Sequence, residues 1–230
     1  FGVKKPLISY HEHNHVTAGQ SVLNRLLAGE SCALMTDAGT PAISDPGEDL
    51  VRLCAENGVE VRAIPGCCAA VNALAVSGLP TGRFTFEGFL TVNKKSRREH
   101  LNSLKGETRT MIFHEAPHKL RTTLNDLTET FGPDRRISLC RELTKLHEEV
   151  LRFTLAEAVS YYEENAPKGE YVLVVAGAAP KTGAVVTLED GVAQVLALKE
   201  QGMRLKDAAK EVAEHTGLSK NELYAAALER

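Results

Sequence analysis

The sequence predicts an α/β fold of two lobes followed by a small helical segment. In the first third of the chain, apolar runs alternate with helical stretches over short links, which is typical of a parallel sheet. From Phe84 the order of elements indicates a mixed sheet, and after Leu188 apolar residues recur at helical spacing. We expect an N-terminal α/β lobe at residues 1–80, a second α/β lobe at 81–180 and a helix-turn-helix-like segment at 185–230.

The first lobe is predicted to contain three short strands, at Leu7–Tyr10, Cys32–Met35 and Val59–Ile64. A helix is expected at Ser21–Leu27, where apolar residues have helical spacing and Gly29 marks the end.

A second helix is expected after the segment S-D-P-G-E-D-L. Asp45 is the predicted N-cap, Pro46 suits the first turn and Glu48 stands at the capping-box position. This helix should end near Asn57, just before the third strand.

The second lobe begins after a linker at Gly78-Leu79-Pro80. Its predicted strands are Phe84–Phe86, Thr110–Phe113, Arg136–Cys140, Val150–Phe153 and Tyr171–Val175. Its predicted helices are Arg97–Leu104, His118–Phe131 and Leu155–Asn165, the last opened by the capping box T-L-A-E. Ala176–Ala184 is the expected boundary, and three short helices should follow at Leu188–Gln201, Leu205–His215 and Ser219–Leu228.

The composition excludes several classes of protein. With 230 residues, 43% of them hydrophobic, the chain can bury a core, but a net charge of −3 excludes a globally basic nucleic-acid binder. The five cysteines form no C-x-x-C pair and suit neither a zinc cluster nor a disulfide framework. No apolar run approaches the length of a membrane span and no signal-peptide pattern is present, so we expect a cytoplasmic protein.

Two loops hold small residues between a predicted strand and a predicted helix. They are D-A-G-T-P (Asp37–Pro41) and P-G-C-C-A-A (Pro65–Ala70). Ligands of open parallel sheets bind outside the carboxyl ends of the strands, so two such loops predict a shared crevice, although each alone could be an ordinary tight turn. Neither loop has a P-loop or G-x-G-x-x-G pattern, which favours a small polar cofactor held mostly by backbone.

Several motifs in one order carry a family resemblance. They are L-M-T-D-A-G-T-P-A-I-S-D-P-G, I-P-G-C-C-A-A, F-E-G-F-L, I-F-H-E-A-P-H-K-L, R-E-L-T-K and K-G-E-Y-V-L-V-V, between Pro6 and Ala179. The chain resembles the ribosomal RNA small-subunit methyltransferase I family, a branch of the tetrapyrrole (corrin/porphyrin) methylase superfamily. The resemblance implies a two-lobed tetrapyrrole-methylase-like fold, usually a homodimer, that binds S-adenosylmethionine between the lobes. It also implies methylation of a cytidine 2′-hydroxyl in small-subunit (16S) ribosomal RNA.

The resemblance also implies a set of cofactor contacts. The superfamily's Gly-Gly-Asp loop and its Thr-Ala pair, with further contacts, fall on Ala38, Gly39, Thr40, Ile43, Cys68, Ala69, Glu115 and Leu143. The family's opening strands, with their Gly-Asn-Leu loop and Asp-Thr-Arg segment, have no counterpart, and position 1 is Phe rather than Met. We therefore expect that the first lobe is incomplete and that an N-terminal piece is absent.

Methyl transfer to a ribose hydroxyl calls for a general base or a charge stabiliser. The candidates, each of which could equally be a cap or an ion-pair partner, are Asp37, Glu87, Glu115 and Glu142. The run N-K-K-S-R-R suggests a phosphate clamp, although it could be only a solvated helix start. The predicted RNA contacts are Lys94, Lys95, Arg97, Arg98, Lys119, Arg121, Arg141 and Lys145.

Two other signals point elsewhere. His11, His13 and His15 alternate, but no companion ligand pattern lies nearby, so we expect no metal site and interpret them as loop or substrate-contact residues. The segment Gly217–Tyr224, in which Ser219 and Glu222 could form a capping box, resembles the second helix of a helix-turn-helix. A nucleic-acid-binding regulator and a tetrapyrrole methyltransferase therefore remain alternatives.

Overall fold

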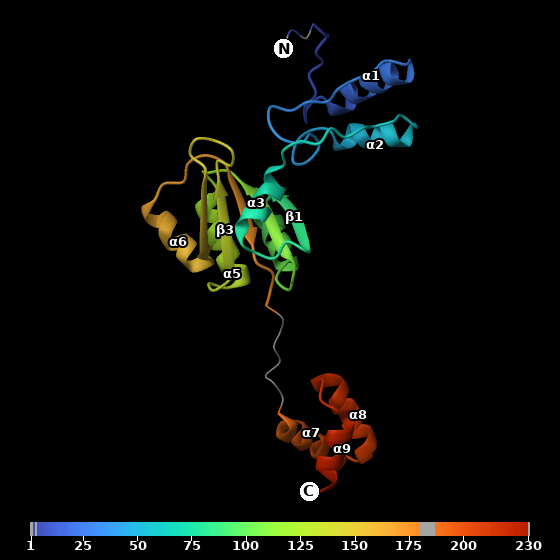
Figure 1. Cartoon of the computed structure of the whole chain (residues 1–230), viewed down its shortest axis with the longest axis vertical. Helices are drawn as coiled ribbons and strands as arrows, with labels where there is room; N and C mark the ends of the chain where they lie inside the picture. The colour runs from blue at the N-terminus through green and yellow to red at the C-terminus, as the bar shows by residue number, and fades with distance from the viewer. Residues whose placement is uncertain (1, 3, 180–186, 230) are drawn as a thin grey trace. The chain divides into compact units, whose positions relative to one another are not determined.

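The computed structural model describes residues 2, 4–179 and 187–229. The chain divides into two compact units, Phe1–Ala178 and Ala179–Arg230 (Figure 1). The predicted boundary segment Ala176–Ala184 falls mostly outside the described residues. The division into lobes at residue 80 stays a prediction.

The first unit contains a mixed sheet, as the sequence predicts. Its strands are β1 (Phe84–Phe89), β2 (Thr110–Glu115), β3 (Arg136–Arg141), β4 (Glu149–Thr154) and β5 (Tyr171–Val175). The strand order is β1-β2-β5-β3-β4. β1 and β2 are parallel, and every other neighbouring pair is antiparallel.

Helices cover both faces of this sheet (Figure 1). The helices around it are α3 (Ala69–Ser77), α4 (Lys94–Ser103), α5 (Leu120–Phe131) and α6 (Leu155–Glu164). Met111 and Phe113 of β2 pack in one buried cluster with Leu124 of α5, whereas Ile112 packs with Ala73 of α3 in another. Because side chains alternate along a strand, odd-numbered residues of β2 face α5 and even-numbered residues face α3.

The segment before α3 differs from the prediction. It holds α1 (His15–Leu27) and α2 (Glu48–Glu56), which bury Val22, Leu50 and Cys54 against each other. The runs predicted as strands, at Leu7–Tyr10, Cys32–Met35 and Val59–Ile64, are not strands in the structure. A strand exists only when a neighbour pairs with its backbone, and within the described residues these runs form no ladder.

The start of α2 also corrects a prediction. The N-cap is Gly47 rather than Asp45, and no side chain caps the helix. Gly47 has φ +138°, and a Cβ there would lie 2.5 Å from Cδ2 of Leu34. Only glycine fits this position, so the helix begins two residues later than the Asp45 cap predicts. The capping box predicted for α6 is confirmed, with Thr154 and Glu157 in reciprocal contact.

The second unit is a three-helix segment with its own core. The helices are α7 (Leu188–Glu200), α8 (Leu205–Thr216) and α9 (Lys220–Leu228), as predicted within a residue or two. Val195, Val212 and Leu223 are among the buried residues of this core. Ser219 accepts from the backbone N–H of Glu222, but the reciprocal half of the predicted capping box is not formed. In the part of the chain that the structure describes, no helix is both long and apolar enough to cross a bilayer.

Candidate functional site

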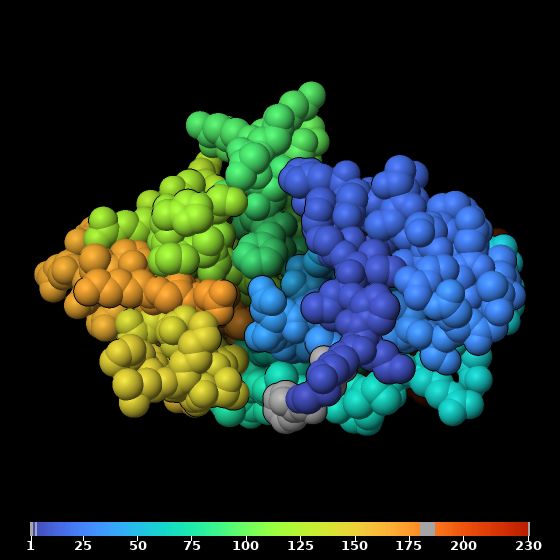
Figure 2. Space-filling view, turned by 90° about the horizontal axis from the view of Figure 1, so that it is seen from above, coloured from blue at the N-terminus to red at the C-terminus, as the bar shows by residue number. Residues whose placement is uncertain are grey.

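The two small-residue loops lie against each other. Thr40 Oγ1 donates a hydrogen bond of 3.0 Å to the backbone carbonyl of Cys67, which joins the loop before α2 to the loop before α3. Gly39 has φ +83°, and a Cβ there would lie 3.7 Å from the same carbonyl. Loop 37–47 also meets β1, because a Cβ on Gly88 would lie 4.0 Å from Ser44 Oγ. Figure 2 shows the first unit from above, with the blue residues of α1 on the right and the orange residues of α6 on the left.

Backbone strain is concentrated in two of the motifs. Among the described residues, the non-glycine positions with positive φ are Ala42 (67°), Ser44 (61°), Glu142 (50°) and Thr144 (66°). The first two lie in D-A-G-T-P-A-I-S-D-P-G and the others in R-E-L-T-K. Such conformations cost roughly 1–3 kcal/mol each and cluster at ligand sites, so these two motifs are the strongest candidates for a binding site.

Cys68 and Leu143, two of the predicted cofactor residues, belong to the same part of the sheet. Both pack against the buried cluster that Ile112 and Val172 form with α3. Ala69 is the first residue of α3, whose N-cap Cys68 makes no side-chain cap. The first-turn N–H groups of α3 therefore have no side-chain acceptor of their own at the point where the two loops meet.

A hollow opens beside the second half of loop 37–47. It is about 460 Å³ in volume, and its lining includes His15, Ser44, Asp45, Gly47 and Arg52. Ala38 and Ile43, two further predicted cofactor residues, are exposed or partly exposed in the same loop.

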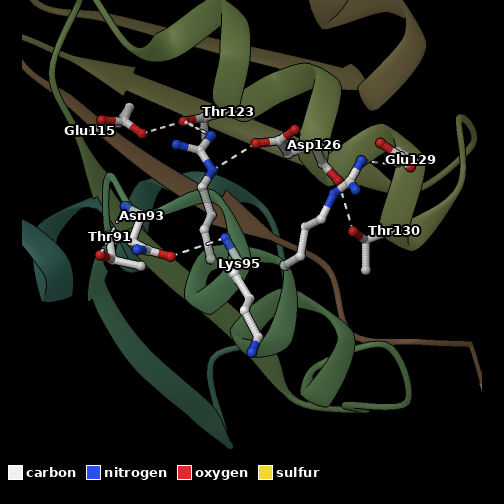
Figure 3. Close-up of polar contacts among 10 residues, drawn as sticks. Thr91, Asn93, Lys95, Glu115, Thr123, Asp126, Glu129 and Thr130 are labelled. Atoms are coloured by element: carbon white, nitrogen blue, oxygen red, sulfur yellow. Dashed lines mark hydrogen bonds and ion pairs between the residues drawn. The ribbon is translucent and has the colours of Figure 1, made fainter.

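Glu115 does not belong to this site, which corrects the prediction that it contacts cofactor or acts as base. It lies on the α5 face of the sheet and is only 3% exposed. One carboxylate oxygen accepts from Thr123 Oγ1 of α5 (Figure 3), and the other accepts from the backbone N–H of Ala116 at 2.8 Å. Both oxygens are occupied, so the side chain ties β2 to α5.

Burial likewise excludes Arg97 from the predicted RNA contacts. The residue is 7% exposed, its Nη2 donates to Thr123 Oγ1 at 3.0 Å, and its Nε lies 2.7 Å from Asp126 Oδ2. Figure 3 shows its two partners on α5, Thr123 and Asp126, with Glu115 in contact with Thr123. A cation buried in this way cannot reach a phosphate.

The other candidate bases differ in their surroundings. Glu87 lies 2.9 Å from Nε2 of His100 on α4. Glu142 accepts from the backbone N–H of Glu170 at 2.9 Å and from Lys145 Nζ at 3.0 Å, and these two donors, in that order, lower its pKa. A carboxylate with a lowered pKa is a weaker base. Asp37 is exposed in its loop and stays a candidate.

The structure brings three of the predicted RNA-contact residues together on α4. Lys94, Lys95 and Arg98 are exposed, and their ion pairs are loose: Lys95 lies 4.0 Å from Glu99 and Arg98 lies 3.7 Å from Glu129. Figure 3 shows Lys95 directed away from the buried contacts.

The remaining predicted RNA contacts are not grouped with that set. Arg121 reaches toward the carbonyl oxygen of Glu163 at the end of α6, and Lys119 is half-buried at the N-cap of α5. Arg141 pairs with Glu149 at 3.3 Å. Lys145 pairs with both Glu142 and Glu170.

The histidines near the N-terminus do not converge. His15 Nδ1 lies 2.5 Å from Asp49 Oδ2, which joins α1 to α2. His11 Nδ1 accepts from the backbone N–H of His13. Within residues 2, 4–179 and 187–229, no group of three or more His, Cys, Asp or Glu side chains could hold a metal ion.

Comparisons with known proteins identify the family. Residues 4–159 match the model of the Tetrapyrrole (Corrin/Porphyrin) Methylases, and residues 186–230 match that of the RsmI C-terminal HTH domain. A protein of Synechocystis sp. named ribosomal RNA small subunit methyltransferase I is 45% identical over 229 residues, which cover 100% of this chain and 82% of the relative. The protein of that name from Escherichia coli O157:H7 is 40% identical, with 100% and 80% covered.

The chain belongs to the ribosomal RNA small subunit methyltransferase I family. Two solved structures place this member of the family within a wider fold. The methyltransferase CobJ has a TM-score of 0.55 at 21% identity, covering 73% of this chain and 74% of its own. Diphthine synthase has a TM-score of 0.52 at 15% identity, covering 72% and 67%. The predicted α/β tetrapyrrole-methylase fold is thus confirmed.

In this family member, His114 is a further candidate site residue that the sequence motifs did not predict. It stands next to Glu115 in I-F-H-E, and on the alternation of β2 it faces α3, the side of the sheet on which Cys68 and Leu143 pack. A signal was present, because a histidine in a buried strand is unusual and needs an explanation.

Proposed function

We propose that this protein transfers a methyl group from S-adenosylmethionine to the 2′-oxygen of a cytidine ribose in small-subunit ribosomal RNA. The observation that carries the proposal is the Thr40–Cys67 hydrogen bond, which joins two motif loops next to the start of α3. The names of relatives that are 40–45% identical over the whole chain support the RNA substrate.

The residues around this hydrogen bond fit the cofactor. S-adenosylmethionine carries an amino-acid carboxylate, an adenosine and a positively charged sulfonium. The uncapped first turn of α3 offers N–H donors to a carboxylate, and Gly39 lets backbone approach a ligand closely. Cys68 and Leu143 offer apolar surface to the adenine. When bound, the cofactor supplies an electrophilic methyl group, and the protein's task is to align an oxygen with it.

The cations of α4 support RNA as the partner. Four residues separate the carboxyl end of β1 from α4, and Lys94 and Lys95 are the first two residues of this helix. Asn93 caps the helix by accepting from the backbone N–H groups of Lys95 and Ser96 at 3.1 Å each. We include Lys94, Lys95 and Arg98 in the proposed phosphate-binding surface. A homodimer, which the resemblance implies, and a cytoplasmic location, which the sequence patterns predict, are part of the same proposal.

The test compares two acceptors. Full-length protein is incubated with methyl-labelled S-adenosylmethionine and either small ribosomal subunits from a strain lacking the gene or a precorrin. We expect label in the RNA and none in the precorrin. Label in the precorrin alone would replace the proposal with tetrapyrrole methylation. Label in neither, with nucleic-acid binding retained, would favour a regulator.

A further inference from the structure

His114 is enclosed between two aromatic rings at the carboxyl end of β2. The ring centroids of Phe86 and Phe89, both on β1, lie 5.1 Å and 5.4 Å from that of the imidazole, each at an edge-to-face angle. β1 and β2 are parallel, so their carboxyl ends lie at the same edge of the sheet. This is also the end from which the chain leads into α4 with Lys94 and Lys95.

The imidazole has an unmet hydrogen-bonding atom. Nε2 of His114 is buried, and it has no partner among the described residues. Leaving such an atom unpaired costs about 1–3 kcal/mol, so an unpaired atom in a native fold suggests a role or an absent ligand. Phe89, which is 55% exposed, forms the outer side of the enclosure. Exposed side chains change rotamer in picoseconds to nanoseconds, so this ring can move aside and open Nε2 to a ligand.

The surroundings of His114 keep its ring neutral. Burial lowers its pKa below the ordinary 6.5, and this effect exceeds the opposing effects of Asp45, from loop 37–47, and Glu170, just before β5. The other facing groups are the uncharged rings of Phe86 and Phe89 and, on the neighbouring strand, Val172. A neutral imidazole near pH 7 has one nitrogen free to accept a proton.

From this geometry we infer that Phe86, Phe89 and His114 form the site for the acceptor nucleoside, in which His114 is the general base. The inference rests on the proposed function. An RNA base taken out of its stack lies against an aromatic side chain, and Phe89 offers such a face. As the 2′-oxygen forms its bond to the methyl carbon, the carbon–sulfur bond breaks and its electron pair stays on sulfur. The hydroxyl proton passes to Nε2 of His114 and then to water.

The placement of the two residues agrees with this assignment: His114 lies on the α3 face, and Glu115 lies on the opposite face. Cys68 and Leu143 pack on that face, and Leu143 stands between the strained residues Glu142 and Thr144, so donor and acceptor would meet on one side of the sheet. Glu115, on the other face, is held by Thr123.

The experiment uses His114→Asn, which keeps a polar side chain but cannot accept a proton at neutral pH. Exposed His118, in the loop after β2, provides the matched control His118→Asn. Single-turnover methylation of small subunits is followed from pH 5 to 8, and S-adenosylhomocysteine binding is measured by calorimetry. We expect a rate loss of about 10²- to 10⁴-fold for His114→Asn. Cofactor affinity should stay within about threefold, and the control should behave as wild type.

The pH profile separates a base from a structural residue. The wild-type rate should fall as pH drops through the pKa of His114, below 6.5, because the protonated ring accepts nothing. This acid limb should match an imidazole titration seen by NMR in the complex with S-adenosylhomocysteine, and both should vanish in His114→Asn. His114→Gln provides a second variant should the first fail to fold.

The inference would be overturned, with the proposed function left standing, by a variant rate within about threefold of wild type or by an acid limb that persists in the variant. A lost acid limb accompanied by lost cofactor binding would also overturn it, in favour of a structural role. Failure of the wild-type protein to methylate RNA would instead contradict the proposed function itself.

Discussion

At the scale of single residues, strand alternation places two neighbouring side chains on opposite faces of the sheet. His114 lies on the α3 face, in ring contact with Phe86, whereas Glu115 is buried against α5 with Thr123 as its partner. Both residues belong to the same sequence motif, I-F-H-E. The sequence cannot separate their roles, because alternation divides the residues into two sets but does not say which helices cover each face.

The Gly39→Val variant tests the candidate cofactor loop. A β-branched residue is strongly disfavoured at φ +83°, and its side chain would lie close to the Cys67 carbonyl. Strain of roughly 1–3 kcal/mol should weaken S-adenosylmethionine binding by about tenfold or more in calorimetry. Gly82→Val is the control, since a Cβ at Gly82 meets no atom within 4 Å and its φ is not positive. Equal affinity for wild type and Gly39→Val would remove this loop from the site.

At the scale of elements, the second lobe was predictable and the first was not. The five predicted strands from Phe84 onward are all present, because each has a strongly apolar run and capped or turn-bounded neighbours. The run Val59–Ile64 looks the same in sequence, yet it remains unpaired. Pairing depends on a neighbour elsewhere in the chain, which local pattern does not reveal. For the same reason, local pattern did not predict the burial of Arg97, since a run of cations predicts that each of them is exposed.

The contacts between α4 and α5 give a matched pair of variants. Asp126 pairs with Arg97, whose side chain is 8% exposed, and Glu129 pairs with Arg98, whose side chain is 57% exposed. Asp126→Asn leaves a buried cation without its counterion and should lower the free energy of unfolding by about 2 kcal/mol. Glu129→Gln should change it by less than about 0.5 kcal/mol. Urea unfolding measures both, and equal effects would contradict the burial of Arg97.

The exposed cations of α4 can be tested as a group. If Lys94, Lys95 and Arg98 neutralise phosphates, replacing all three by Ala should weaken small-subunit binding. The slope of log K against log salt should fall by up to roughly 2–3, since each of the three lost phosphate contacts removes roughly 0.7–0.9. Cofactor affinity should not change, because these side chains lie on α4 and not in the motif loops. An unaltered salt slope would mean that these three cations are only a solvated helix start and do not bind phosphates.

At the scale of the whole molecule, the candidate residues for methyl transfer all lie in the first unit. The motif loops, His114 and the α4 cations fall between residues 37 and 145, within the unit Phe1–Ala178. A net charge of −3 means that attraction to RNA must come from a local surface such as α4. The second unit has its own core and needs no packing from the sheet to be compact.

The central claim is that the methyl group sits on a ribose oxygen of small-subunit RNA. A 2′-O-methyl group blocks alkaline cleavage of the adjacent phosphodiester, because the 2′-oxygen can no longer attack phosphorus. Alkaline ladders of small-subunit RNA are compared between a wild-type strain and one lacking the gene. We expect one cytidine that resists cleavage in the wild type, is cleaved in the deletion and resists again after incubation with full-length enzyme and S-adenosylmethionine. Identical ladders from the two strains throughout this RNA would contradict it.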